Sequence, residues 1–108
     1  MILERENIVF LKGAQRKYLR GLAHNYNPAA FVGHKGITDS LINEINDALE
    51  ACELIKVKFV DFKERKIKSM MALDIAEKTD SHLAGLIGHV AFYYRQHKDQ
   101  GKRKIVLP

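Results

Sequence analysis

The sequence has 108 residues, 46% of them hydrophobic, which is enough for one domain with its own core and without metal or disulfide support. A single cysteine, Cys52, excludes an intrachain disulfide and favours a reducing compartment. No apolar stretch approaches the ~20 residues of a membrane span, and the first residues lack the pattern of a secretory signal, so we expect a cytoplasmic protein without a membrane partner.

The net charge of +5 is distributed unevenly along the chain. Asp and Glu are absent between Asn7 and Ile37, whereas residues 39–64 carry seven acidic side chains and three basic ones. The acid-free segment contains seven basic residues, counting histidine: Lys12, Arg16, Lys17, Arg20, His24, His34 and Lys35. A region that collects positive charge and excludes negative charge favours a polyanionic ligand, and RNA in particular.

A helix is predicted over residues 11–25, where apolar residues recur close to helical spacing. Its basic residues repeat every four positions at Lys12, Arg16, Arg20 and His24, with Lys17 beside them. Each step rotates about 40° on a helix, so these side chains form a stripe on one side. A merely solvated helix usually mixes Glu with Lys, and this stripe has no acid, so a binding role is favoured over simple solvation.

The apolar run Ala29–Val32 predicts a short buried strand, and the tetrapeptide Gly33-His34-Lys35-Gly36 follows it. Thr38 is the expected N-cap of a second helix. A GxxG loop that opens a helix can bring bare backbone and a lysine close to a phosphate, as in KH-type RNA-binding domains. A lone GxxG is more often an ordinary turn that needs positive φ. Because this loop opens a helix and lies beside an acid-free segment, the sequence favours phosphate binding and an ordinary turn about equally.

The remaining segments complete an α-β-α-β-α-β-β order. Strands are predicted over residues 54–60, 83–87 and 90–94, the last two forming a hairpin around Gly88-His89, and a third helix over residues 64–79. The apolar face of that helix is expected at Ile67, Met70, Met71 and Ile75. Lys56 and Lys58 lie on one face of their strand, where they either extend the basic surface or keep the sheet soluble. The order predicts an α/β protein of the two-layer α+β kind.

Two features near the C-terminus leave alternatives open. Tyr93 and Tyr94 are adjacent in a strand and therefore point to opposite faces. One is expected in the core, and the other is either half-buried or free to stack on a base. The polar segment that follows, which is rich in Lys and Arg, either wraps a phosphate backbone or is a solvated tail.

Catalysis is not supported by the sequence. Cys52 falls on the apolar stripe of the second helix and is expected to be buried. The five histidines show no metal-ligand spacing, and no GxxxxGK[ST] phosphate loop is present. We therefore expect no enzymatic activity, no catalytic residues, no metal, no cofactor and no small-molecule substrate.

Four separate blocks resemble the CRM domain, which is named for chloroplast RNA splicing and ribosome maturation. They are Leu19–His24, Val32–Thr38, Glu53–Lys58, and Ile87–His89 together with Tyr94-Arg95. The blocks occur in the family's order and span nearly the whole chain, whose length is similar to that of single-domain, YhbY-like members.

The resemblance implies a fold like the C-terminal domain of bacterial translation initiation factor three, with an extra N-terminal helix. It implies helices packed on one face of a four-stranded mixed sheet, and RNA binding through the GxxG loop and an adjacent basic helix face. The candidate RNA-binding residues are Lys12, Arg16, Lys17, Arg20, His24, Gly33, His34, Lys35, Gly36 and Arg95. The expected organisation is an N-terminal extension (1–10), a CRM-like RNA-binding domain (11–95) and a basic C-terminal tail (96–108).

The expected function is a non-catalytic RNA-binding protein. Because YhbY-like proteins are associated with precursors of the large ribosomal subunit, its partner is expected to be ribosomal RNA or its precursor. One alternative is a protein-interaction module that docks on an acidic ribosomal or translation-factor surface. Another is a subunit of an RNA-modifying enzyme whose catalytic residues lie on a partner chain. The sequence leaves the oligomeric state and the RNA site open.

Overall fold

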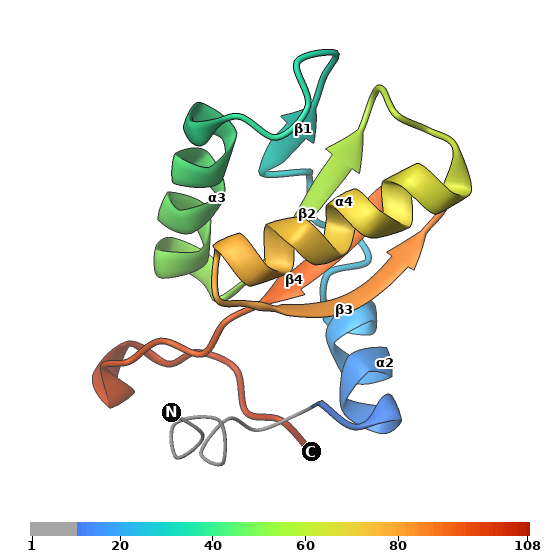
Figure 1. The fold of residues 1–108 in the computed structure, drawn as a ribbon. Coiled ribbons are helices and arrows are strands. Elements are labelled where there is room, and N and C mark those ends of the chain that lie inside the picture. The colour runs from blue at the N-terminus through green and yellow to red at the C-terminus, as the bar shows by residue number, and fades with distance from the viewer. Residues whose placement is uncertain (1–10) are drawn as a thin grey trace, which may run out of the picture.

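The computed structural model describes residues 11–108, so the predicted N-terminal extension lies outside the described residues. The described helices are α2 (Gly13–Leu22), α3 (Asp39–Cys52), α4 (Arg65–Lys78) and the short 3-10 helix η1 (Gln100–Lys102). The strands are β1 (Ala30–Val32), β2 (Leu54–Phe59), β3 (His82–Ile87) and β4 (Val90–Tyr94). The predicted element order is confirmed (Figure 1), although the first helix is shorter than the 11–25 expected. None of the helices within 11–108 is long and apolar enough to cross a membrane.

The strands form one mixed sheet in the order β1-β2-β4-β3. β1 pairs with β2 in parallel, as the intervening helix requires, and the other neighbours are antiparallel. The predicted hairpin joins β3 to β4, with an irregularity in register between Leu83 and Gly85. The expected four-stranded mixed sheet is therefore confirmed.

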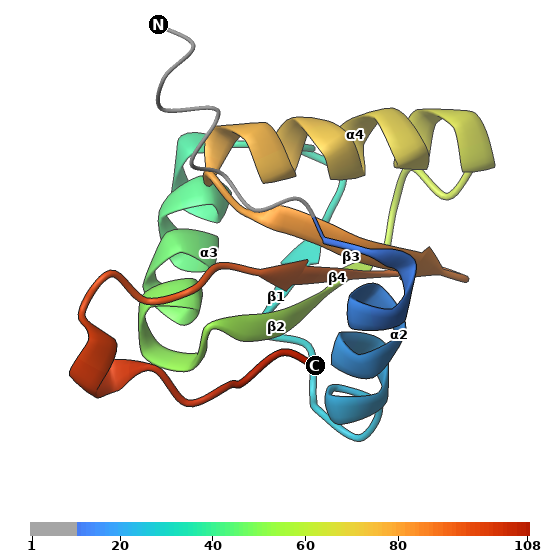
Figure 2. The ribbon, with the colours of Figure 1, turned by 90° about the horizontal axis from the view of Figure 1, so that it is seen from below.

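The helices lie on both faces of this sheet (Figures 1 and 2). α3 and α4 cover one face, over a core whose largest members include Ile45, Phe59, Ile75 and Tyr93. α2 covers part of the opposite face, where its Leu19 contributes to a second, smaller core. The expectation of helices on one face thus holds for α3 and α4, and α2 is the exception.

Helix α3 begins where the sequence predicts it. The Thr38 side chain accepts a hydrogen bond from the Leu41 N–H (3.1 Å), which is an N-cap. Leu41, Ile45 and Leu49 are buried at four-residue intervals. The prediction that Cys52 is buried was wrong, since this side chain is exposed. The next step of the four-residue series falls on Glu53, which is buried in its place.

The buried face of α4 also differs from the prediction. Ile67 and Met70 are 42% and 64% exposed, whereas Lys68, Ala72, Ile75 and Ala76 face inward. The two alanines allow the helix to approach the sheet closely, and the Tyr93 hydroxyl donates a hydrogen bond to the Ala72 carbonyl (2.8 Å). The prediction is therefore confirmed for Ile75, holds in part for the partly buried Met71, and was wrong for Ile67 and Met70.

Candidate nucleic-acid interface

The Gly33–Gly36 loop is a tight turn at the carboxyl end of β1. The Gly36 N–H donates a hydrogen bond to the Gly33 carbonyl (2.9 Å). Gly36 has φ +72°, so the turn itself requires glycine there. At Gly33 φ is not positive and an added Cβ would meet no atom within 4 Å, so the fold does not require glycine at this position. Gly33 consequently leaves open backbone at the surface, beside the exposed side chains of His34 and Lys35.

The topology brings further positive charge to this end of the sheet. The segment after β2 lies against the end of β1, because the N–H groups of Val60 and Asp61 both donate to the Val32 carbonyl (3.0 and 3.2 Å). Lys58 and Lys63 flank this junction and are exposed. The loop is therefore joined by lysines from a different strand and a different connection.

The β3–β4 turn adds a third contribution. Lys68 of α4 is 6% exposed, and its Nζ donates to the Gly88 carbonyl (2.5 Å) and lies 3.1 Å from His89 Nδ1. Loss of water around the ring, and then the positive charges of Lys68, Lys63 and Lys58, lower the pKa of His89. The 3.1 Å contact between Lys68 and His89 thus adds a further cationic side chain next to the β3–β4 turn.

Sequence reasoning missed Lys63, Lys68 and His89 and left Lys58 undecided. They are distant in sequence and come together only through the sheet order. The regular lysine alternation of β2 was the one signal that could have found part of this cluster. We call the half-buried Gly33 and the exposed residues His34, Lys35, Lys58, Lys63 and His89 the loop-end surface.

The predicted basic stripe on α2 lies elsewhere. Figure 1 shows α2 at the opposite end of the strands from the β1–α3 loop, so the structure does not bring stripe and loop into one adjacent surface. Arg20 Nη1 donates to the Ala84 carbonyl (2.8 Å), and Arg16 Nη1 to the Leu11 carbonyl (2.7 Å). Arg20 is thus part of how α2 attaches to β3. The stripe members with exposed side chains are Lys12, Arg16, Lys17 and His24.

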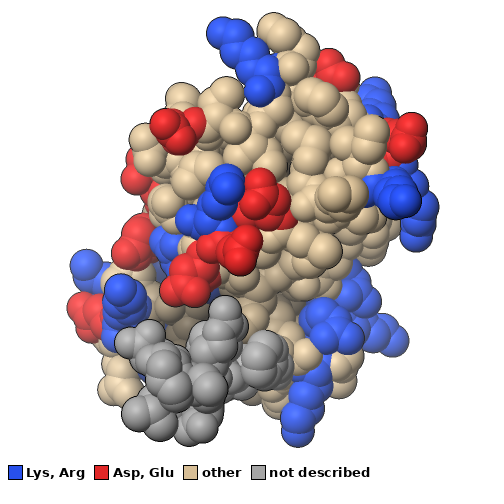
Figure 3. Space-filling model, in the orientation of Figure 1, with Lys and Arg blue, Asp and Glu red and all other residues tan. Residues whose placement is uncertain are grey.

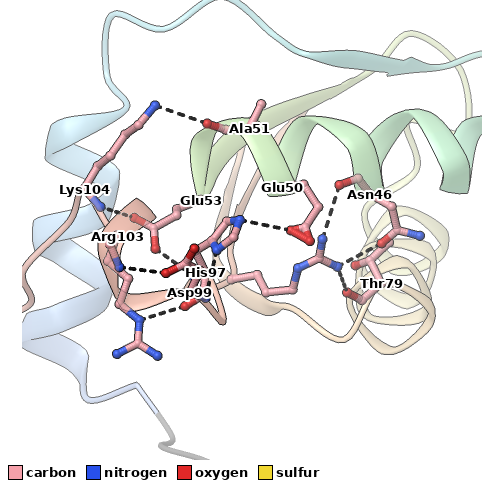
Figure 4. Close-up of polar contacts among 11 residues, drawn as sticks. Asn46, Glu50, Ala51, Glu53, Thr79, His97, Asp99, Arg103 and Lys104 are labelled. Carbon is pink, nitrogen blue, oxygen red and sulfur yellow. Dashed lines mark hydrogen bonds and ion pairs between the residues drawn. The ribbon is translucent and has the colours of Figure 1, made fainter.

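Arg95 is committed to contacts within the protein. Its Nη1 donates to Asn46 Oδ1 (2.9 Å) and to the Thr79 carbonyl (2.6 Å), and its Nη2 donates to the Asn46 carbonyl (3.2 Å). The guanidinium therefore ties α3 and the end of α4 to the chain that follows β4 (Figure 4). An RNA contact by Arg95 stays a prediction, and these bonds give it no support.

The C-terminal tail folds back onto the domain. Glu53 Oε2 accepts from the His97 N–H (2.7 Å), and Oε1 accepts from the N–H groups of Lys104 (2.7 Å) and Ile105 (3.2 Å) (Figure 4). Burial opposes ionisation of this carboxyl, but the three donors outweigh it, and the pKa of Glu53 is lowered. Ile105 and Leu107 then pack on the second core. The tail is therefore neither a free solvated segment nor a free arm for a phosphate backbone.

Charge is unevenly distributed over the surface that Figure 3 shows. Acidic side chains gather over α3 and the neighbouring end of α4, with several basic ones among them. The upper and right edges carry basic side chains with acidic ones beside them, and the area over α2 shows basic side chains. An uncharged area lies over α4, and Leu73 of this helix is 60% exposed. A polyanion is favoured where the basic side chains predominate and is repelled by the acidic group over α3.

The described residues offer little for catalysis. Within 11–108 no three His, Cys, Asp or Glu side chains converge in a group that could hold a metal ion. Cys52 lines a shallow hollow of about 420 Å³ with Tyr26, Leu54 and Lys104. Tyr94 is 3% exposed, so the option that it stacks on a base was wrong. The Gly33–Gly36 turn combines accessible backbone with nearby lysines, which are the groups that proteins commonly use to contact phosphate.

Comparison with known proteins identifies a family and several relatives. The family model for the CRS1/YhbY (CRM) domain matches residues 11–95. A Haemophilus influenzae protein named an RNA-binding protein is 37% identical over 98 residues, which cover 91% of this chain and 95% of that protein. The probable RNA-binding protein YqeI of Bacillus subtilis is 36% identical over 98 residues, covering 91% of this chain and 99% of YqeI.

A solved structure supports the fold as well. The solution structure of a Staphylococcus aureus protein, described as a candidate RNA-binding protein, superposes with a TM-score of 0.77 at 37% identity. The match covers 92% of this chain and all of that one. From the sequence, the fold and these matches, the chain belongs to the CRS1/YhbY (CRM) domain family.

Proposed function

We propose that this protein binds RNA without chemically changing it, and that the loop-end surface is its principal contact with the phosphate backbone. The observation that carries the proposal is the combination at one turn of an open glycine, Gly33, and exposed lysines from three separate segments. Backbone N–H groups and ammonium groups bind phosphate without reading sequence. The exposed residues of α2 form a second, separate contact region.

The RNA is ribosomal RNA or its precursor, bound during assembly of the large ribosomal subunit. The resemblance of the chain to single-domain YhbY-like proteins supports this finer proposal, while the relatives of similar length that are named RNA-binding proteins support RNA as the partner. Two basic regions at opposite ends of one sheet suit a folded RNA that contacts a small protein at several points.

A second candidate function is a protein contact in the same assembly. Ile67, Met70 and Leu73 of α4 are 42%, 64% and 60% exposed and recur at helical spacing on the outer side of the helix. An apolar stripe of this kind favours a protein partner rather than a phosphate backbone. It would act beside RNA binding, because it lies apart from the lysines of the loop-end surface.

The proposal is tested by fluorescence anisotropy with purified protein and a labelled fragment of large-subunit ribosomal RNA, over a series of salt concentrations. Contacts to about four to six phosphates predict a log–log salt slope of about −3 to −5. Lys35→Glu combined with Lys58→Glu should weaken binding and flatten the slope. Lys78→Glu combined with Lys98→Glu reverses the same number of charges at two exposed lysines near Glu50 and Asp80, and this variant serves as the control, with a much smaller loss expected.

Wild-type protein that fails to bind the RNA at low salt would contradict the proposal. Equal losses in the loop-end and control variants would show that only net charge matters. To test the ribosomal assignment, tagged protein is crosslinked to RNA in cells and the bound RNA is sequenced. Crosslinks spread over messenger RNA, with none in large-subunit RNA or its precursor, would contradict that part.

A further inference from the structure

One row of side chains across the sheet is left uncovered. In register across the four strands stand Phe31 of β1, Lys58 of β2, Val90 of β4 and Ile87 of β3. Residues in register share a face, and here it is the face that carries α2. Phe31 is 53% and Ile87 58% exposed, Lys58 is exposed, and Val90 is half-buried. The row is an apolar strip with one lysine and no acidic member.

The next row shows that this exposure is not a property of the whole face. There Lys56, Phe92 and Gly85 stand in register. Lys56 Nζ lies 5.6 Å from the centre of the Phe92 ring and donates to the carbonyls of His24 (2.7 Å) and Tyr26 (3.2 Å). Phe92 is 6% exposed. Helix α2 and the turn after it therefore cover the row of Lys56 and Phe92 but do not reach the next row, which contains Phe31.

The position of Phe31 relates the strip to the loop-end surface. Phe31 precedes Gly33 by two residues on the same strand, a rise of about 7 Å. Lys58 is its neighbour on β2, at the ~4.8 Å spacing of paired strands. An exposed phenyl ring beside a flexible ammonium group, close to a phosphate-binding turn, matches a nucleotide: the ring takes the base and the lysine takes the phosphate.

We propose that Phe31 is a stacking platform for one unpaired nucleobase of the bound RNA, with Lys58 holding the adjoining phosphate. This inference rests on the proposed function and names the part of the RNA that the sheet recognises. A base in a duplex is already stacked on both sides and cannot lie on the ring. The strip therefore selects single-stranded segments such as loops, bulges and ends. The charge around the ring favours this occupant over the apolar side chain of a protein partner.

The test compares Phe31→Ala, Phe31→Trp and the control Leu73→Ala, an exposed apolar residue on α4. Each is titrated with a single-stranded RNA that contains 2-aminopurine and with the same sequence in a duplex. Phe31→Ala should weaken single-strand binding by about 5- to 150-fold, the range found per stacked base, and leave duplex binding unchanged. Phe31→Trp and Leu73→Ala should bind the single strand as well as wild type. Stacking should quench the 2-aminopurine fluorescence in wild type and Phe31→Trp but not in Phe31→Ala.

The titrations distinguish failure of this inference from failure of the proposed function. If wild type binds neither RNA, the proposed function itself fails. If wild type binds both and Phe31→Ala binds them equally well, RNA binding stands and the stacking platform is overturned. An equal loss on single strand and duplex would also overturn it, and would point to a general apolar contact. Because Phe31 is exposed, Phe31→Ala is expected to fold, and a retained thermal melt verifies this.

Discussion

The sheet face under α3 and α4 buries side chains of β1, β2 and β4 and partly buries Leu83 and Leu86 of β3, whereas the face under α2 leaves Phe31 and Ile87 more than half exposed. Two long helices of 14 residues each cover the first face. One helix of 10 residues and the returning tail cover the second. Stability is thus concentrated on one side, and the other side keeps exposed strand residues next to the Gly33–Gly36 turn. The side chains under α3 and α4 therefore stabilise the fold, whereas exposed side chains on the α2 face are available to a ligand.

The sharpest test of this comparison is a matched pair of truncations, one on each face. Ile45→Ala removes a fully buried side chain beneath α3 and should lower the free energy of unfolding by about 2–5 kcal/mol, because it leaves a cavity. Phe31→Ala on the opposite face should cost less than about 1 kcal/mol, the span of strand propensity. Urea denaturation measures both. Similar costs for the two variants would mean that Phe31 belongs to the core.

A smaller effect is expected where the tail completes the second face. Glu53→Gln replaces a buried carboxylate that accepts three backbone N–H groups, so it should cost about 1.5–3 kcal/mol. Glu44→Gln, an exposed carboxylate earlier in α3, is the control and should stay within about 0.5 kcal/mol. Urea denaturation of the two variants measures the difference, and equal costs would mean that the tail is not held by Glu53.

The same carboxylate predicts a pH dependence. Folding lowers the pKa of Glu53 below its ordinary value of 4.5, so its contribution is fully present above that pH. The contribution is lost as the pH falls through the lower, folded-state value. The stability difference between wild type and Glu53→Gln should therefore shrink below about pH 4.5. A difference that is constant from pH 7 to pH 3 would argue against an ionised Glu53.

The two loop glycines provide a finer comparison within one turn. Gly36→Ala forces a Cβ into a left-handed conformation and should cost about 1–2 kcal/mol. Gly33→Ala adds a Cβ in open space and should be neutral or slightly stabilising. Thermal melts distinguish them. If Gly33→Ala were the more destabilising change, Gly33 would be a structural glycine and its openness to a phosphate would lose its support.

The smallest expected effect concerns how α2 attaches to its face. Arg20→Ala removes the bond to the Ala84 carbonyl and the packing over Gly85, where an added Cβ would lie 2.5 Å from Arg20 Cδ. A loss of about 0.5–1.5 kcal/mol is expected, whereas Lys17→Ala on the exposed side should be close to neutral. Denaturant midpoints measure the two. Equal midpoints for the two variants would mean that Arg20 does not help to attach α2 to β3.

Local patterns predicted the elements because their causes are local. The Thr38 cap, the alternation of β2 and the Gly88-His89 hairpin each involve neighbours in sequence. The buried face of α4 was predicted correctly at Ile75 and incorrectly at Ile67 and Met70, because apolar residues lie on more than one side of that helix. Contact with the sheet selects its alanine side, and the buried Lys68 is satisfied by the distant Gly88 carbonyl.

The candidate site was predictable only in part, because some of its residues are brought together by contacts between distant segments. The Gly33–Gly36 loop is contiguous in sequence and stands out by its glycines. Lys63 and His89 join it through strand pairing, which a charge count along the chain does not show. The same pairing places the α2 stripe at the other end of the strands and commits Arg20 to the Ala84 carbonyl. Sequence reasoning thus found the basic segments and could not tell which of them face the same ligand.

The most direct test of the account is an NMR titration of isotope-labelled protein with single-stranded RNA, following each backbone amide. The account predicts that the largest shifts fall on Phe31–Gly36, around Lys58 and at His89, with a smaller set on the exposed side of α2. The acidic outer face of α3, including Glu44 and Asp47, should be unaffected. Shifts centred on α3 or on the outer side of α4, with the Gly33–Gly36 loop unchanged, would contradict it.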